Sequence, residues 1–278
     1  MAATSLTPRL AGLIVNGVLL GAAAATVAPL VWMLSVSLMS PGEASTFPPP
    51  MVPGQPTLAN YRELFTHAGM GRYLVNSVVI TVAVTLVSLL FNVAAGYAFA
   101  KLPFTGRDRI FKSLLAALVI PGQVAMVPLF LLLKQLGLVN TYGGVIVPAM
   151  ASIFGMFVVR QYALSIPDQI LESARIDGAS EFRIFRSVIV PVLRPIIMTL
   201  AVFTSLGTWN DFMWPLIVLN DSDLYTLPVA LASLSREHVQ DNELMMAGAV
   251  LTTLPVLAVF LILQRYYVEG LMLGSVKG

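Results

Sequence analysis

Polar side chains inside long apolar runs are the residues of this 278-residue sequence whose types and spacing could do chemistry. A desolvated amide or carboxylate is costly in hydrocarbon, so such groups are rare there and usually have a function. Each of them either lines a route for a polar solute or ties neighbouring helices together. The candidates are Asn92, Gln123, Asn210 and Asp211, with Trp209 and Trp214 flanking the last two.

The segment from Trp209 to Trp214 combines aromatic rings with an amide and a carboxylate. Aromatic rings can stack on a sugar ring while the polar groups bond its hydroxyls, so this segment could contact a carbohydrate. Alternatively, both tryptophans belong to an aromatic belt at the membrane surface, and Asn92 and Gln123 only tie helices together. The sequence leaves both interpretations open.

No pattern in the sequence is typical of an enzyme or a metal site. The chain has no cysteine, and His67 and His238 stand apart from any group with metal-ligand or acid–base spacing. It also has no Gly-x-x-x-x-Gly-Lys-Ser/Thr phosphate loop, so any nucleotide that powers it must be bound by another polypeptide. We therefore expect a non-catalytic chain without a metal or cofactor of its own.

Residues 165–191, called the docking loop below, predict a helix, a glycine turn and a second helix. Ser165 to Asp168 has the form of a capping box with an early proline, and Gly178 should end the first helix. Ser180 can cap the second helix. One apolar face is expected on each helix, formed by Ile166, Ile170 and Ala174 on the first and by Phe182, Phe185 and Ile189 on the second.

From Glu172 to Pro191 the chain resembles the membrane-spanning permease subunits of ABC importers. Their hallmark is Glu-Ala-Ala, three residues, Gly, nine residues, then Ile-x-Leu-Pro. Here Ser173 replaces the first Ala, and Val188 and Val190 stand for the Ile and the Leu, with the spacing kept. Further stretches resemble the carbohydrate, maltose-type branch of that family: Leu58–Tyr61, Asn76-Ser77, Gly96–Ala100, Trp209–Phe212, and the ending from Gly270-Leu271 to Val276-Lys277-Gly278.

This resemblance, which covers nearly the whole chain, implies an all-α integral membrane protein with six transmembrane helices and the type I ABC importer permease fold. It implies a cytoplasmic coupling-helix loop that couples to an ATPase through Glu172, Ser173, Ala174, Asp177, Gly178 and Pro191. The implied partners are a second homologous permease, two nucleotide-binding ATPase subunits that hold ATP and Mg, and an extracytoplasmic solute-binding protein. The implied function is ATP-driven carbohydrate import by alternating access.

Composition independently indicates a membrane protein. The chain is 57% apolar and 11% charged, against roughly 45–50% and about 25% in soluble proteins. We expect a single transmembrane permease domain, residues 1–278, whose apolar runs are near the ~20 residues that cross a bilayer. The runs are about 10–39, 74–100, 113–133, 143–159, 192–219 and 245–263, and prolines that permit kinks lie within or near them at Pro121, Pro128, Pro148, Pro215 and Pro255.

The distribution of basic residues predicts the orientation. With the N- and C-termini cytoplasmic in a bacterial inner membrane, twelve of the 16 Lys and Arg lie on or near the inside, as the positive-inside rule requires. These twelve are Arg9, Lys101, Arg107, Arg109, Lys112, Arg160, Arg175, Arg183, Arg186, Arg194, Arg265 and Lys277, and the others are Arg62, Arg72, Lys134 and Arg236. Because the basic residues border spans, no nucleic-acid partner is expected.

Two polar connections should lie outside the membrane. Residues 40–72 are rich in proline and either touch a delivery protein or form a plain surface loop. Residues 220–244 concentrate acids that should solvate an exposed face: Asp221, Asp223, Glu237, Asp241 and Glu243. The alternative function, an ion-coupled secondary transporter of a small polar solute, would require mid-membrane carboxylates and an internal repeat. Only Asp211 is available, and no repeat is evident.

Overall fold

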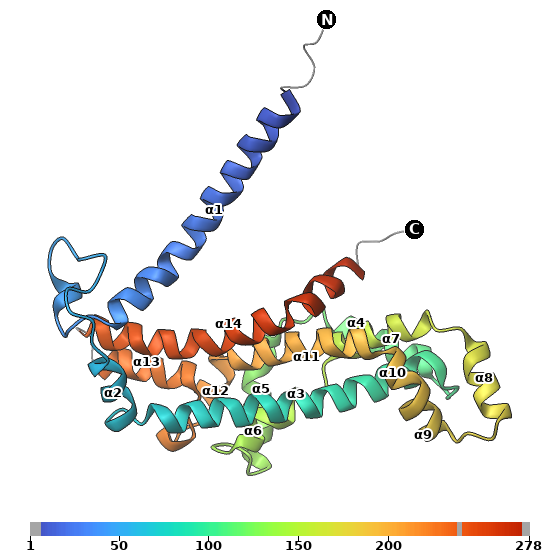
Figure 1. Ribbon diagram of the computed structural model, residues 1–278. Helices are drawn as coiled ribbons and strands as arrows, with labels where there is room; N and C mark the ends of the chain where they lie inside the picture. The colour runs from blue at the N-terminus through green and yellow to red at the C-terminus, as the bar shows by residue number, and fades with distance from the viewer. Residues whose placement is uncertain (1–6, 238–240, 274–278) are drawn as a thin grey trace, which may run out of the picture. The chain divides into compact units, whose positions relative to one another are not determined.

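The computed structural model describes residues 7–237 and 241–273, and every regular element within them is helical (Figure 1). His238 and the family-like ending from 274 to 278 lie outside the described residues. The α-helices are α1 (Thr7–Ser37), α2 (Ala59–Thr66), α3 (Met70–Lys101), α4 (Arg107–Ala117), α5 (Met126–Gln135), α6 (Tyr142–Ile146), α7 (Ile153–Leu164), α8 (Asp168–Ile176), α9 (Glu181–Ile184), α10 (Val190–Val192), α11 (Arg194–Trp209), α12 (Met213–Val218), α13 (Leu227–Glu237) and α14 (Asn242–Leu273). Shorter helical turns between them are η1 (Glu43–Ser45), η2 (Gly122–Ala125), η3 (Val147–Ala149), the π-helical η4 (Phe185–Ile189) and η5 (Ser222–Leu224).

Apolar helices long enough to cross a membrane account for most of the six expected spans. Among the described residues, four continuous stretches qualify, and two bent helix pairs raise the number to 6 if each pair is one span. The continuous stretches are Gly12–Ser37, Met70–Lys101, Tyr142–Leu164 and Asn242–Ile262. Backbone amides and carbonyls that are paired within a helix need no water, which is why these apolar runs are helical.

The third expected span, residues 113–133, is not one straight helix. Arg107–Ala117 and Gly122–Gln135 meet at 95°. Pro121 lies at the break with φ −60° and ψ 130°, outside the helical region. It has no N–H to continue the hydrogen-bond ladder, and it disfavours helical backbone in the residue before it. A kink was therefore predictable at Pro121, but the size of the bend was not.

The chain folds as two compact units. Unit 1 comprises Met1–Met70 and Leu231–Leu254, and unit 2 comprises Gly71–Ala230 and Pro255–Gly278.

In unit 1 the chain that leaves α1 is held by polar side chains. The buried Asn60 amide donates to the carbonyls of Ser37 at 3.0 Å and Met39 at 2.8 Å, at the end of α1. The Glu43 carboxylate accepts from the N–H groups of Gly54 at 2.7 Å and Ser40 at 3.0 Å, and these two bonds lower its pKa. The connection between α1 and α2 therefore has a defined shape.

Glu243 does not solvate an exposed face, although the acidic composition of residues 220–244 predicted that it would. Its side chain is fully buried in unit 1, where Oε1 accepts the N–H of Ala44 at 2.7 Å. Asp223, in unit 2, is exposed as expected and forms an ion pair with Arg72.

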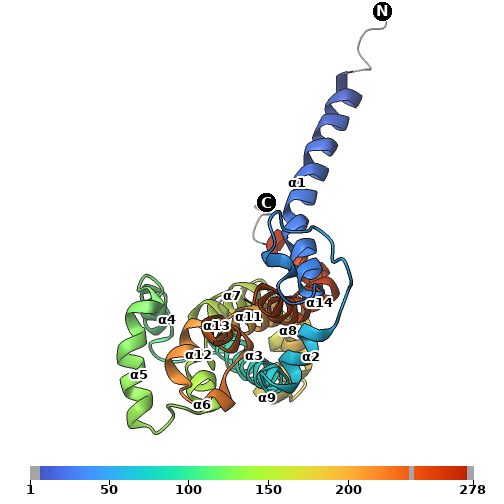
Figure 2. The same cartoon turned by 90° about the vertical axis from the view of Figure 1, so that its left-hand side faces the viewer.

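Unit 2 contains two apolar clusters. The first joins α3, α7 and α11 to the docking loop, and the second joins α3 to α5, α6 and α12 through Ile80, Leu133, Val145, Trp214 and Val218. Figure 2 shows α5, α6 and α12 side by side at one edge of this unit, and α12 packs against both of the others. Helix α3 runs past both clusters and is therefore the common support of unit 2.

Helices α3 and α7 touch because glycines remove side chains from their contact. A Cβ added at Gly96 would lie 2.6 Å from the Cβ of Val159, and one added at Gly155 would lie 2.5 Å from the Nδ2 atom of Asn92. Small residues of this kind allow helices in membranes to approach closely.

We expect Gly96→Ala to lower the melting temperature of the purified protein. The clash with Val159 should cost about 1–3 kcal/mol, which exceeds the gain of about 1 kcal/mol that alanine brings to a helix interior. Gly207→Ala in α11 is the matched control, because nothing lies within 4 Å of its added Cβ. A melting temperature of Gly96→Ala equal to that of the control would contradict the close contact of α3 and α7.

Candidate functional site

The docking loop folds as two short helices joined by a left-handed glycine. Helix α8 ends at Ile176, and Gly178 follows with φ +79°. The N–H of Gly178 donates to the carbonyl of Arg175 and the N–H of Ala179 to that of Ala174, both at 3.0 Å. These two bonds form a Schellman motif, in which glycine is favoured because it has no Cβ to clash at positive φ. The expected glycine turn is present.

The caps of these helices differ in part from expectation. Ser165 does not cap α8, because its Oγ donates to the carbonyl of Tyr162 at 2.7 Å and Pro167 occupies the N-cap position. The Ser165 hydroxyl bonds this carbonyl at the end of α7 and is therefore not used to cap α8. Ser180 does cap α9, since its side chain accepts the N–H of Arg183 at 3.4 Å.

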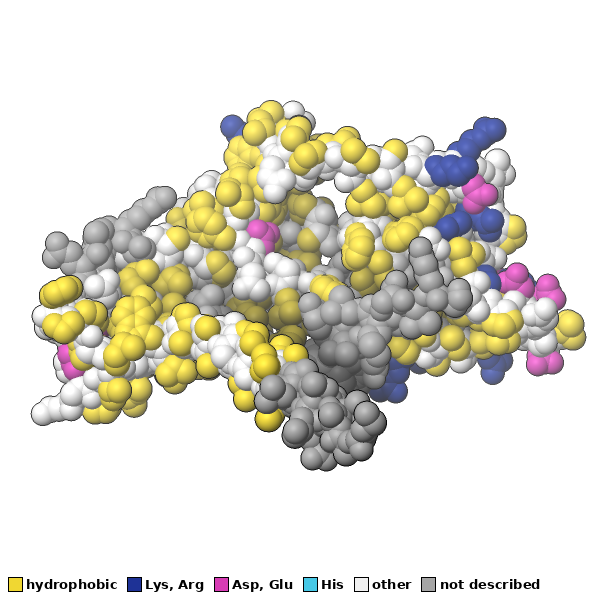
Figure 3. Space-filling model, turned by 90° about the horizontal axis from the view of Figure 1, so that it is seen from above, with side chains coloured by type: hydrophobic (Ala, Val, Ile, Leu, Met, Phe, Trp, Pro, Cys, Tyr) yellow, Lys and Arg dark blue, Asp and Glu magenta, His cyan; other side chains and the backbone are white. Residues whose placement is uncertain are grey.

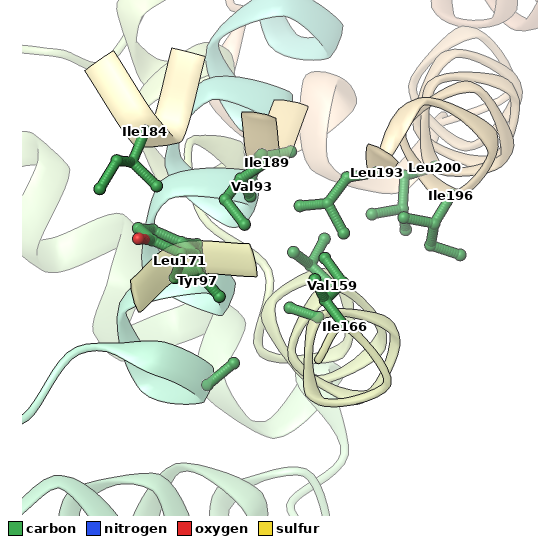
Figure 4. Packing of buried hydrophobic residues seen from close by; sticks show 12 residues of the cluster. Val93, Tyr97, Val159, Ile166, Leu171, Ile184, Ile189, Leu193, Ile196 and Leu200 are labelled. Atoms are coloured by element: carbon green, nitrogen blue, oxygen red, sulfur yellow. The ribbon is translucent and has the colours of Figure 1, made fainter. Parts of the chain in front are cut away.

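The buried side of the docking loop agrees with the predicted one in part, since Ile166, Ala174, Phe185 and Ile189 all pack in the first cluster. Leu171 and Ile184 are almost fully buried, whereas Ile170 and Phe182, expected on the apolar faces, are exposed by 44% and 72%. The buried face of α8 passes through Ile166, Leu171 and Ala174, which lie three to five positions apart. Figure 4 shows how Leu171, Ile184 and Ile189 converge on Val93 and Tyr97 of α3. The prediction was thus wrong for Ile170 and Phe182, and it missed Leu171 and Ile184.

Lys101 holds the start of α8 against the end of α3. Its Nζ atom donates to Asp168 Oδ1 and to the carbonyl of Ile166, each at 2.6 Å, and its side chain is only 7% exposed. The hydrogen bond from Lys101 lowers the pKa of Asp168. Asp168 also lies in the first turn of α8, where a negative charge is favourable.

A second attachment holds the other end of α8. Arg175 Nε donates to Glu181 Oε1 at 2.7 Å, and the hydroxyl of Tyr97 on α3 donates to Glu181 Oε2 at 3.3 Å. The hydrogen bond from Arg175 lowers the pKa of Glu181. The start of α8 is therefore bound to α3 directly through Lys101, and its end is bound to α3 through Glu181.

The outer surface of the docking loop combines apolar and polar side chains. Ile176 is 86% exposed, and Phe182 and Ile170 are exposed near it in sequence. The expected coupling residues Glu172, Ser173, Asp177, Gly178 and Pro191 are exposed as well, while Ala174 is half-buried against the core. In Figure 3 the Lys and Arg side chains of unit 2 gather toward the end of this unit where α8 and α9 lie. This surface has the exposure that a contact with another subunit requires.

The candidate solute-pathway residues do not form one site. Asn92 is buried, and its Nδ2 donates to Ser88 Oγ while its Oδ1 accepts the N–H of Ser152, each at 2.9 Å. This pattern fits the helix-tie interpretation, because the amide joins α3 to the start of α7. Gln123 is exposed in η2, outside both apolar clusters.

The segment from Trp209 to Trp214 is the break between α11 and α12. Asn210 closes α11 and donates its Nδ2 to the carbonyl of Leu206 at 2.8 Å, and Asp211 Oδ1 accepts the N–H of Trp214 at 3.3 Å. The Trp214 Nε1 atom donates to the carbonyl of Gly144 at 3.1 Å inside the second cluster. Trp209 is also buried. The polar groups that interrupt the fifth expected span thus cap the two helix ends that they create.

Sequence reasoning missed a cavity of about 370 Å³ between α3, α7 and α11. Its polar lining comes from small hydroxyl side chains together with the amide of Asn92, namely Ser88, Ser152, Thr204 and Thr208. Ser88 and Asn92 are four residues apart, as are Thr204 and Thr208, so each pair shares one helix face. That spacing was the signal available in the sequence.

Among the described residues, no three His, Cys, Asp or Glu side chains gather as metal ligands do.

Comparison with known proteins agrees with this architecture. The family described as "Binding-protein-dependent transport system inner membrane component" matches residues 92–272. The arabinooligosaccharides transport system permease protein AraQ of Halalkalibacterium halodurans is 40% identical over 245 residues, covering 88% of this chain and 86% of that protein. The lactose transport system permease protein LacG of Rhizobium radiobacter is 34% identical over 279 residues, covering 99% of each chain.

A solved chain from a bacterial ABC transporter involved in the import of the acidic polysaccharide alginate shares the fold. The TM-score is 0.84 at 24% sequence identity, and the match covers 96% of this chain and 100% of the other. This chain belongs to the binding-protein-dependent inner membrane components, the permease subunits of ABC importers. It is a multi-pass, non-catalytic membrane subunit.

We expect Glu181→Ala to speed hydrogen exchange of the backbone amides of α8 and α9 several-fold at neutral pH. The change removes the carboxylate that holds both Arg175 and Tyr97, so the end of α8 opens more often. Exchange mass spectrometry on the purified protein measures the effect. Arg183→Ala, at an exposed arginine of the same loop, is the control. Equal exchange in both variants would show that the Arg175–Glu181 pair does not hold the loop.

The same attachments should give the docking loop a pH dependence. The pKa values of Glu181 and Asp168 lie below their ordinary values of 4.5 and 3.8. A carboxylate with a lowered pKa contributes stability above its unfolded-state pKa and loses it as the pH falls through the folded-state value. After correction for intrinsic rates, wild-type exchange in α8 and α9 should stay constant from about pH 8 to about pH 5 and rise only below about pH 4.

Proposed function

We propose that this chain is the permease subunit of a carbohydrate importer and that its docking loop transmits ATP-driven movement to the spans. The observation that carries the proposal is the attachment of both ends of α8 to α3 through Lys101 and Glu181. Because of these attachments, a movement of α8 caused by an ATPase subunit would also move α3. Closure of two ATPase subunits on ATP would then switch the spans between inward- and outward-facing states.

Each expected coupling residue has a role in this proposal. Glu172, Ser173 and Asp177 offer polar contacts on the exposed side of α8. The small side chain of Ala174 allows α8 to pack closely against the core. Gly178 makes the turn into α9, and Pro191 begins the passage toward α11. By resemblance to the family, residues 271–278 are also proposed for the contact with the ATPase, although 274–278 lie outside the described residues.

The proposed partners are a second homologous permease, two ATPase subunits that bind ATP and Mg, and an extracytoplasmic solute-binding protein. The proposed location is a bacterial inner membrane with both termini cytoplasmic. Support comes from Lys101, Arg160 and Arg175, which lie at the docking-loop end of unit 2, as the positive-inside rule predicts for a cytoplasmic face. In this proposal, residues 1–278 form a single transmembrane permease domain.

A carbohydrate is the proposed solute for two reasons. The names of two relatives refer to arabinooligosaccharides and lactose. The cavity between α3, α7 and α11 is also lined by hydroxyls and one amide rather than by charges, and such groups exchange hydrogen bonds with neutral sugar hydroxyls. Ser88, Thr204 and Thr208 are better placed for the solute than Trp214, whose indole is packed in the second cluster. Trp209, Asn210 and Asp211 remain proposed pathway residues at the break of the fifth span.

Ion-coupled secondary transport is not favoured. The family to which the chain belongs is described as binding-protein-dependent, and its members are permease subunits of ATP-driven importers. Asp211, the only carboxylate available for ion coupling, bonds the N–H that begins α12.

The exposed apolar side chains of the docking loop should be part of the ATPase contact. We expect the double change Ile176→Ser and Phe182→Ser to reduce the amount of ATPase subunit that copurifies with the permease. Each side chain would otherwise bury apolar area worth about 1.5–3 kcal/mol. Leu164→Ser, an exposed apolar residue at the end of α7, is the control. Undiminished copurification of the double variant would rule out this contact surface.

Gly178→Asp tests the whole proposal in a reconstituted complex with its solute-binding protein. A charged side chain at the left-handed turn should leave membrane insertion intact while abolishing sugar uptake and the stimulation of ATP hydrolysis by loaded binding protein. Ligand screening of the solute-binding protein identifies the sugar to be used. Gly178→Asn, neutral and tolerant of positive φ, should lose less activity. Normal uptake by Gly178→Asp would refute coupling through this loop.

A further inference from the structure

The segment Thr46–Leu58 of unit 1, called the proline loop below, exposes large apolar side chains although it is not helical. Phe47 is 99% exposed, Met51 75% and Val52 72%. No charged residue occurs between Glu43 and Arg62, so the whole proline loop is uncharged. A cluster of large apolar side chains exposed to water is unfavourable, and such clusters mark contacts with a partner or a membrane.

The proline loop is held in one shape. Glu43 Oε1 accepts the N–H of Gly54 at 2.7 Å, and the N–H of Thr57 donates to the carbonyl of Leu38 at 2.8 Å. Five prolines further restrict the backbone and remove N–H donors that would otherwise need water: Pro48, Pro49, Pro50, Pro53 and Pro56. The exposed apolar side chains are therefore displayed on a restrained backbone with few unpaired donors.

A hydrogen bond fixes the position of the proline loop along the axis of α1. Ser35 Oγ donates to the carbonyl of Met51 at 2.7 Å. Ser35 lies two residues before the end of α1 at Ser37, so Met51 lies level with the last turn of an apolar membrane-spanning helix, about 3 Å from its end along the axis. Trp32, one turn deeper and 37% exposed, is the type of residue that marks the membrane interface.

From these three observations we infer that the proline loop inserts its apolar side chains, led by Phe47, Met51 and Val52, into the interfacial region of the lipid bilayer. A lipid surface fits an uncharged, proline-rich loop tied to the end of a spanning helix. Apolar side chains gain by leaving water there, and the missing N–H groups need no partner. The inference is independent of which solute is transported and of how the docking loop is coupled.

The test uses site-directed spin labels, for which a chain without cysteine is well suited. Phe47→Cys, Met51→Cys and Val52→Cys are labelled with a nitroxide in the assembled importer, with any cysteines of its other subunits replaced. The importer is then placed in nanodiscs of phosphatidylethanolamine and phosphatidylglycerol. Collision rates with O₂, which concentrates in the bilayer, and with a water-soluble nickel chelate are compared. His67→Cys is the aqueous reference, because that side chain is exposed beside Glu63.

The three loop labels should collide severalfold more with O₂ relative to the nickel chelate than the His67 label does. They should do so without the solute-binding protein. Ratios equal to that of the His67 label would overturn the inference. So would labels that lose contact with the nickel chelate only after the binding protein is added, because that result would assign the loop to a protein partner. Three separate positions guard against one variant that fails to fold.

Discussion

The arrangement of the docking loop depends on the ammonium group of Lys101, whose side chain is only 7% exposed. It lies at the end of α3, the helix that runs past both apolar clusters of unit 2, and it holds Asp168 and the carbonyl of Ile166. A buried cation must be paired, so the chain between α7 and α8 has little freedom to move away. Glu181 completes the attachment at the other end of α8. Ion pairs and hydrogen bonds thus attach the short helix α8 to the end of the membrane helix α3.

Within the spans, polar groups mostly satisfy the backbone at helix breaks. Asn92 joins α3 to the start of α7, and Asp211 caps the start of α12. The indole of Trp214 likewise reaches the carbonyl of Gly144. Because water is scarce at membrane depth, each interrupted helix requires such a partner. The same need explains why Asn92, Asp211 and Trp214 are engaged with the protein. The hydroxyl side chains of Ser88, Thr204 and Thr208 line the cavity.

In unit 1, polar side chains bond the backbone carbonyls at the end of α1. The last carbonyls of that helix are met by the amide of Asn60, and the connection that follows is built around the carboxylate of Glu43. Buried Glu243 joins the turn at Ala44 to α14. The proline loop shows the consequence, since a restrained backbone can hold large apolar side chains outward. The two units thus use carboxylates in similar ways, one to shape a loop and the other to anchor a helix.

The sequence alone was sufficient for the helical membrane class, most of the spans, the glycine turn at Gly178 and the cap at Ser180. These features follow from local rules: apolar run length, the absence of a Cβ, and the reach of a serine hydroxyl. The family-like spacing from Glu172 to Pro191 also identified the docking loop. Only the tertiary structure decided that Leu171 rather than Ile170 faces the core, that Glu243 is buried, and that the chain turns by 95° near Pro121. The pairing of Lys101 with Asp168, and of Glu181 with Arg175 and Tyr97, likewise depends on which helices pack together. Such contacts join residues far apart in the chain, and sequence periodicity carries no information about distance across a fold.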